Sequence, residues 1–171
     1  NAITIDGGEC VIGGGHGNII EISGNHSLIA GGAYNRLSGS ASTINGGDSN
    51  EIEASWASII AGGNGNRIGT AGFCSVVGGG GWNRVGASSE FSIIAGGSQN
   101  NIGTNTRAGT ISGGEGNVIA SNCGQATIEE ERATEFYKIL LPASSQGVAV
   151  TDRHELRVER DWWGQWQRYR R

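Results

Sequence analysis

The chain has 171 residues, including 32 glycines, one proline and no methionine, and its formal net charge is −4. The glycines follow no three-residue period, which excludes a collagen-like helix, and no run of about 18 apolar residues occurs, so we expect no membrane insertion. Only four arginines, dispersed among eight acids, lie within residues 1–125, so we expect no nucleic-acid partner.

A Gly-Gly pair recurs seven times, followed three residues later by Asn and then, two residues further on, by Ile, Leu or Val. The copies begin at Gly14, Gly31, Gly46, Gly62, Gly79, Gly96 and Gly113, in steps of 15 to 17 residues. A near-constant period this short is typical of a solenoid, in which each repeat forms one turn of a stacked coil. The sequence therefore predicts an all-β fold, a β-solenoid (β-roll) of about seven or eight coils with 15–17 residues each.

The fourth copy shows how one coil is built. Two short strands are expected near Ser58–Ala61 and Asn66–Gly69, and a Gly-rich corner that tolerates positive φ joins them. Because side chains alternate along a strand, Ile60 and Ile68 are expected in the core. The equivalent positions form two facing core ladders: Ile12, Ile29, Ile44, Val77, Ile94 and Ile111 on the first strand, and Ile20, Leu37, Ile52, Val85, Ile102 and Ile119 on the second.

One Asn follows the glycine pair in every copy. These residues are Asn18, Asn35, Asn50, Asn66, Asn83, Asn100 and Asn117. We predict a stacked ladder, in which amide hydrogen bonds pass from coil to coil and satisfy half-buried corner groups. A row of exposed amides that binds sugar or ice is the alternative interpretation.

Each strand also carries an outward column of side chains. The column on the second strand includes Arg36, Glu51, Arg67 and Arg84, which is typical of a solvated face. The column on the first strand is mostly apolar and β-branched, and consists of Val11, Leu28, Thr43, Ile59, Val76, Ile93 and Thr110. At about 4.8 Å per coil this stripe is on the order of 30–35 Å long, which should not be left in water. We therefore predict that these seven residues form an oligomer interface between parallel copies related by cyclic symmetry.

The repeat becomes degenerate after the seventh copy. Residues 126–136 align with that copy and place Ile128 and Phe136 at the two core positions, but Glu replaces both glycines and Thr replaces the Asn. We expect an eighth coil that caps the stack with charge, and a short helix through Glu129–Leu141 is the alternative. The solenoid domain is accordingly placed at residues 1–136, with a C-terminal segment rich in Trp and Arg at 137–171.

The C-terminal segment contains four aromatic residues of interest, Trp162, Trp163, Trp166 and Tyr169. Trp162, Trp166 and Tyr169 would share one face of a helix, whereas Leu156 and Val158 alternate as in a strand. The segment is either a small packed cap, a region that docks on a partner subunit, or a Trp/Arg surface that contacts a glycan by stacking.

The sequence shows no catalytic, metal or cofactor motif. The corner superficially resembles the calcium-binding nonapeptide GGxGxDxU, but the Asp is missing from every copy and calcium needs carboxylate oxygens. Cys10, Cys74 and Cys123 are too scattered for a disulfide framework. We therefore predict a non-enzymatic protein without cofactor, although a polysaccharide-degrading tailspike with acids drawn from adjacent subunits would leave no local motif.

The repeat [Ser/Thr]-x-Ile-x-Gly-Gly-x-x-Asn-x-Ile resembles the β-roll heads of YadA-like trimeric autotransporter adhesins and repeat segments of bacteriophage tail fibres, over roughly residues 2–136. Those adhesin heads use a shorter, Ala-rich coil, so this chain departs in corner length and in its Asn ladder. The resemblance implies a homotrimer, extracellular or on a virion surface. It also implies a structural and receptor-binding segment, with other fibre subunits or a cell-surface glycan as further partners.

A second resemblance is to grass ice-binding proteins, which are β-rolls with Asn-x-Val-x-Gly units. Residues 66–69 (Asn-Arg-Ile-Gly) and 83–86 (Asn-Arg-Val-Gly) are similar to those units. Ice binding usually needs a flat outward array of small, Thr-like residues. The candidate column instead mixes Leu28, Ile59 and Ile93 with Thr43 and Thr110, so ice binding is the alternative to adhesion.

Overall fold

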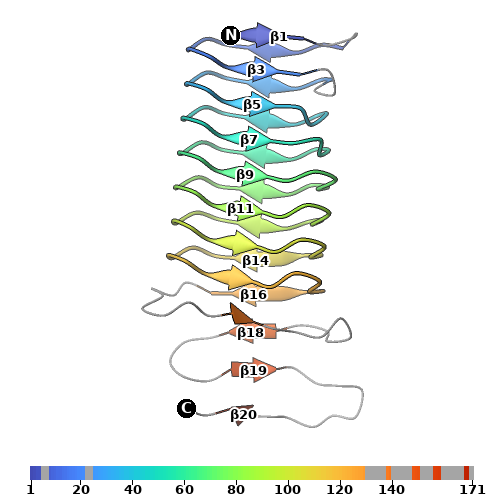
Figure 1. The fold of residues 1–171 in the computed structure, drawn as a ribbon, viewed down its shortest axis with the longest axis vertical. Coiled ribbons are helices and arrows are strands. Elements are labelled where there is room, and N and C mark those ends of the chain that lie inside the picture. Colours follow the sequence, from blue (N-terminus) through green and yellow to red (C-terminus); the bar gives the residue numbers. More distant parts are fainter. Residues whose placement is uncertain are drawn as a thin grey trace.

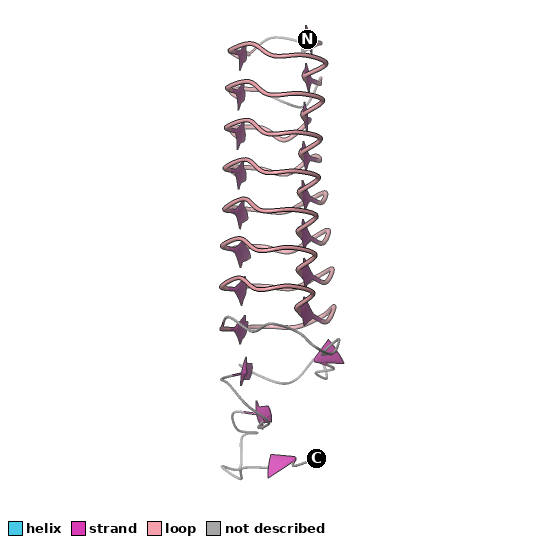
Figure 2. Ribbon diagram, turned by 90° about the vertical axis from the view of Figure 1, so that its left-hand side faces the viewer, coloured by secondary structure: helices cyan, strands magenta, loops and turns pink. Residues whose placement is uncertain are grey.

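The computed structural model describes residues 1–4, 8–21 and 25–129, together with four further strands between residues 138 and 169. These parts are all-β, and all strands but the last two stack in parallel into a β-solenoid of about seven turns (Figure 1). Figure 2 shows the strands as two columns on opposite sides of the stack, joined by loops that cross between them. The predicted fold class is therefore confirmed for the single chain.

One column is a nine-stranded sheet. Its strands, in spatial order, are β1 (Ala2–Ile3), β3 (Ile19–Ile20), β5 (Arg36–Leu37), β7 (Glu51–Ile52), β9 (Arg67–Ile68), β11 (Arg84–Val85), β13 (Asn101–Ile102), β15 (Val118–Ile119) and β17 (Lys138–Ile139). Neighbouring strands are parallel, and the register places each residue on its equivalent in the next coil, as where Ile68 pairs with Val85.

The other column is an eleven-stranded sheet. Its strands, in spatial order, are β2 (Val11–Ile12), β4 (Leu28–Ile29), β6 (Thr43–Ile44), β8 (Ile59–Ile60), β10 (Val76–Val77), β12 (Ile93–Ile94), β14 (Gly109–Ile111), β16 (Ala126–Ile128), β18 (Val148–Val150), β19 (Leu156–Val158) and β20 (Arg168–Tyr169). Pairing is parallel from β2 to β18, whereas β19 and β20 join it antiparallel. The strand expected around Leu156 and Val158 is thus present.

The core is a narrow layer between the two sheets. Each strand from β3 to β15 directs one Ile, Leu or Val inward, and from Ile20 to Ile119 all of these residues have 0 % exposure. Ile12, in the first complete coil, is partly buried and packs against the same cluster. Burial of each such side chain contributes roughly 1.5–3 kcal/mol relative to exposure. The two predicted core ladders are confirmed, and they explain how a chain with only 36 % apolar residues fills its interior.

The corner between the sheets depends on the second glycine of each pair, whose φ lies between +82° and +91° in all seven copies. At Gly47 an added Cβ would lie 2.1 Å from the carbonyl oxygen of Gly63 in the next coil and 2.7 Å from Nδ2 of Asn50. Backbone conformation and coil stacking therefore both exclude a side chain there. The first glycine has more room around it, but its φ is also positive in five copies, between +134° and +159°. Gly31 is constrained neither by φ nor by space, since a Cβ there would have no atom within 4 Å.

The end of the stack differs from the expectation. Strand β16 pairs with β14 and buries Ile128, as predicted for an eighth coil. The second strand of that coil is β17, where Ile139 pairs with Ile119, so the prediction that Phe136 takes this position is wrong. Phe136 itself lies outside the described residues.

The corner that leads from β16 to β17 is longer than the seven glycine corners, and this length sets the register of β17. In each of the seven glycine corners the two core residues are eight positions apart, as are Ile60 and Ile68. Ile128 and Ile139 are eleven positions apart. Their corner differs because Glu and Thr replace the Gly and Asn that shape the others. The alternative prediction of a short helix through Glu129–Leu141 is wrong, because Lys138–Ile139 is a strand. Both sheets also continue past residue 136, since β18 pairs in parallel with β16.

Substitution of Gly47 should destabilise the fold far more than substitution of Gly31. Gly47→Ala is expected to lower the free energy of unfolding by more than about 2 kcal/mol, because the alanine is strained at positive φ and overlaps the next coil. Gly31→Ala, the matched control, should change it by less than about 0.5 kcal/mol. Urea unfolding followed by circular dichroism measures both variants, and equal midpoints would contradict this account of the corner.

Candidate functional site

The ladder asparagines lie at the glycine corner, and all seven are at most 3 % exposed. In Asn66, the backbone N–H donates to Oδ1 of Asn50 (3.0 Å) and Nδ2 donates to the carbonyls of Gly62 and Gly80 (both 3.0 Å). Its Oδ1 accepts the backbone N–H of Asn83 (3.0 Å). One side chain therefore joins three successive coils. Because the amides are buried, the structure presents no row of exposed Asn side chains for sugar or ice.

A second buried ladder runs along the opposite corner and consists of serines. Its members are Ser27, Ser42, Ser58, Ser75 and Ser92, which are at most 3 % exposed. The Oγ of each accepts the backbone N–H of the equivalent residue in the next coil, as from Ser58 to Ser42 (3.1 Å), and the N–H of Gly109 closes the series at Ser92 (3.2 Å). The Ser or Thr that opens the repeat motif is the sequence signal for this ladder. Neither ladder offers a free group for chemistry.

The seven candidate interface residues form a continuous column on the outer face of the eleven-stranded sheet. The register stacks Thr43 on Ile59, Ile59 on Val76, and Val76 on Ile93. Val11 is 55 % exposed, and Ile59 and Ile93 are each 41 % exposed. The other four, Leu28, Thr43, Val76 and Thr110, are half-buried. The column is therefore an apolar stripe along the stack, interrupted by two threonines.

The outer face of the nine-stranded sheet carries a chain of ion pairs. Arg36 binds both carboxylate oxygens of Glu21 (2.9 and 3.0 Å) and lies 3.4 Å from Glu51. Arg67 lies 3.3 Å from the other oxygen of Glu51 and also pairs with Glu53. The hydrogen bonds to Glu21 and Glu53 raise the pKa of Arg36 and Arg67 respectively, so both guanidinium groups stay charged at neutral pH. This face has the solvated character that its sequence indicates.

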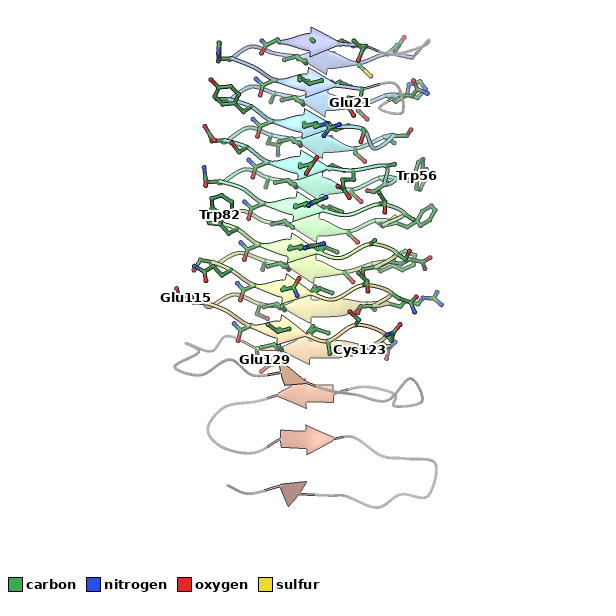
Figure 3. The ribbon with its side chains drawn as sticks, in the orientation of Figure 1. Glu21, Trp56, Trp82, Glu115, Cys123 and Glu129 are labelled. Atoms are coloured by element: carbon green, nitrogen blue, oxygen red, sulfur yellow. The ribbon has the colours of Figure 1, made fainter. Side chains whose placement is uncertain are left out.

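Aromatic side chains stand at the two corners of the stack. Trp56 and Trp82 lie at opposite edges (Figure 3) and are 52 % and 66 % exposed. Trp56 contacts Phe73 in the next coil, with ring centroids 6.4 Å apart. Large aromatic residues this exposed contribute little to the core, so these corners are candidate contact surfaces.

The proposed glycan-contact residues of the C-terminal segment are only partly placed. Tyr169 belongs to β20 and pairs with Leu156 of β19, so its expected position on a helical face is wrong. Trp162, Trp163 and Trp166 lie outside the described residues.

The structure supplies few groups for metal or covalent chemistry. Among the described residues, no group of three or more His, Cys, Asp or Glu side chains is placed to hold a metal ion. In the same parts of the chain no helix is long and apolar enough to cross a membrane. Cys74 and Cys123 are free thiols, and burial raises the pKa of Cys123. Comparison of the sequence with known protein families and with curated proteins found no match.

Loss of a ladder asparagine should be costly. Asn66→Ala leaves the carbonyl of Gly62 and the N–H of Asn83 without this partner, and the carbonyl of Gly80 keeps only its bond from the Asn64 N–H. The variant is expected to lower the free energy of unfolding by about 3 kcal/mol or more. Asn64→Ala, at an exposed position of the same corner, should have an effect below about 0.5 kcal/mol. Denaturant unfolding of the two variants tests this. Similar losses in both would show that the ladder hydrogen bonds do not support the stack.

The thiols should react in order of burial. Burial raises the pKa of Cys123, so at pH 8 we expect iodoacetamide to label half-buried Cys74 well before Cys123, and peptide mass spectrometry can follow both. Because the folded chain retains the Cys123 proton to a higher pH than the unfolded chain, alkaline pH should favour unfolding through this group. Faster labelling of Cys123 in the native chain would contradict its placement.

Proposed function

We propose that this chain is a non-enzymatic structural and receptor-binding segment of a bacteriophage tail fibre or surface adhesin, which assembles as a parallel homotrimer outside the cell or on a virion. The single observation that carries the proposal is the apolar column on the eleven-stranded sheet. It exposes Val11, Ile59 and Ile93 on a face that runs the length of the stack. Contiguous apolar surface of this kind marks an interaction site.

A second copy of the same chain is the partner that fits this column best. Each two-residue strand offers one outward side chain, so a partner must present a matching group about every 4.8 Å along the axis. Another β-solenoid with the same coil spacing meets that requirement over its whole length. Around a threefold axis parallel to the stack, the apolar columns of three copies would meet at the centre and cover one another.

The nine-stranded sheet supports a one-sided assembly. Its outer face is occupied by the ion pairs of Arg36 and Arg67 with Glu21, Glu51 and Glu53. Charged groups of this kind are well solvated and would lose that solvation in an interface. The trimer would therefore bury the eleven-stranded sheet and present the charged sheet and both corners to the surroundings.

Ice binding is the alternative that the same column suggests, because a flat parallel sheet holds outward groups at regular spacing. The column varies from Thr43 to Ile59 in size and polarity, which makes it a poorer match to ice than to an apolar partner. A strictly monomeric chain with thermal hysteresis would favour ice binding. Cleavage of a polysaccharide by the assembled protein would favour a tailspike.

Charge in the apolar column should dissociate the assembly. Ile59→Lys/Ile93→Lys places two ammonium groups in the proposed interface, where burial without a partner costs several kcal/mol each. Light scattering should give the mass of three chains for the wild type and of one chain for the variant. Circular dichroism should be unchanged, since both side chains point away from the core.

The matched control places the same charges on the opposite sheet. Ile19→Lys/Val118→Lys alters two outward apolar residues of the nine-stranded sheet and should leave the mass unchanged. A monomeric wild type, or a trimer that survives Ile59→Lys/Ile93→Lys, would refute the proposed interface.

A further inference from the structure

A groove of about 330 Å³ lies on the outer face of the nine-stranded sheet, beside the glycine corners of the third to fifth repeats. The side chains of Trp82, Arg67, Arg84 and Glu51 line it, together with Ser49. Its aromatic member stands at the edge of the stack, where Figure 3 shows Trp82 directed outward. The groove therefore combines one indole, two guanidinium groups, a carboxylate and a hydroxyl on a rigid sheet.

The stability of the fold does not explain why a Trp occupies position 82. The residue has φ +58°, a left-handed conformation that is unfavourable for a large side chain, and it is 66 % exposed. The equivalent position is glycine in three other coils, at Gly17, Gly65 and Gly116. The same left-handed conformation recurs at Ser49 and Gln99, so it belongs to the corner. An exposed indole at a position where Gly, Ser or Gln suffices points to a role in binding.

The chain makes room for the indole. A Cβ at Gly65, in the preceding coil, would lie 2.8 to 3.0 Å from three atoms of the Trp82 ring. The ring thus lies against Gly65, and its exposure leaves apolar surface open to the groove. A flat ligand with C–H groups on one face would pack against an indole placed in this way.

Arg84 supplies a charge that no acid among the described residues neutralises. In the register it lies between Arg67 and Asn101. Arg67 already pairs with Glu51 and Glu53, whereas no ion pair of Arg84 occurs among the residues that the structure describes. A guanidinium group presents parallel N–H donors that match a carboxylate.

The corner of Tyr34 and Arg36 provides an internal comparison. Tyr34 also has a left-handed φ, of +54°, and also lies over a glycine, Gly17. There the aromatic ring contacts His16, with centroids 5.4 Å apart, and Arg36 is held by both oxygens of Glu21. The same aromatic-x-Arg arrangement is thus satisfied internally at one corner and left open at the other.

We propose that the groove between Trp82 and Arg84 binds an acidic saccharide, with the sugar ring against the indole and its carboxylate on the Arg84 guanidinium. Glu51 and Ser49 also line the groove. The Glu51 oxygens already pair with Arg36 and Arg67, and the Ser49 hydroxyl donates to Asp48, so each would serve a sugar hydroxyl only as a further acceptor. One unpaired guanidinium beside a carboxylate matches a singly charged ligand better than a phosphate dianion. The inference does not need self-association, because the groove lies on the sheet opposite the apolar column.

Titration calorimetry on the full chain tests the inference. The probes are trigalacturonate and sialyllactose, their uncharged counterparts galactotriose and lactose, and sodium acetate and adenosine monophosphate. We expect at least one acidic saccharide to bind ten-fold or more tightly than its counterpart, and more tightly than acetate or the nucleotide. No binding of either acidic saccharide, equal binding of the uncharged forms, or tighter binding of the nucleotide would overturn the proposal.

The variants distinguish the groove from other surfaces. Trp82→Gly introduces the residue that three equivalent coils already contain, so the fold should be kept, and it should weaken saccharide binding at least ten-fold, as should Arg84→Gln. Tyr34→Gly and Arg36→Gln, at the satisfied corner, should change binding less than two-fold. Unchanged binding in the first two variants would overturn the site. The Ile59→Lys/Ile93→Lys chain should still bind, which separates this inference from the proposed trimer.

Discussion

The close axial stacking of the glycine corners is the constraint on which the rest of the structure depends. The second glycine of each pair approaches the carbonyl of the next coil so closely that no Cβ fits, as at Gly47. This approach brings each Asn amide within reach of carbonyls in its own coil and in the next. The same spacing sets the register of both sheets, and so it stacks each core residue on the equivalent residue of its neighbour.

The interior is consequently stabilised by polar ladders as much as by apolar burial. Each coil contributes two apolar side chains to the core, and the corners are filled by a buried Asn and, in most coils, a buried Ser. Their side chains hydrogen-bond backbone groups that would otherwise be buried without partners, which would cost about 1–3 kcal/mol each. Because the core and corner residues stabilise the stack, outward residues such as Ile59 and Arg84 do not contribute to core packing and can serve recognition.

Sequence periodicity predicts this fold well where the corner motif is intact. The equivalents of Gly47, Asn50 and Ile52 recur at the same spacing in every copy. The strands, the core ladders and the outward columns can therefore all be predicted from one coil. The prediction is wrong at Ile139, because the spacing loses its meaning once Gly and Asn are replaced. The Trp82 groove was also beyond prediction, since it depends on where a ring lies over Gly65 and on which arginine lacks a carboxylate, and neither is a property of the repeat.

The constant glycine corner also determines how such a chain can change in length. Between the two core residues that flank it, the glycine corner spans eight positions in all seven copies. The serine corner varies: it spans seven positions from Leu37 to Ile44, eight from Ile52 to Ile60, and nine in the other coils from Ile20 to Ile128. Each coil contacts only the coils before and after it, so a duplicated coil would bring complete contacts on both faces. Gain or loss of whole coils would lengthen or shorten the rod in uniform increments. Among the coils with an intact glycine corner, insertions would be tolerated at the serine corner.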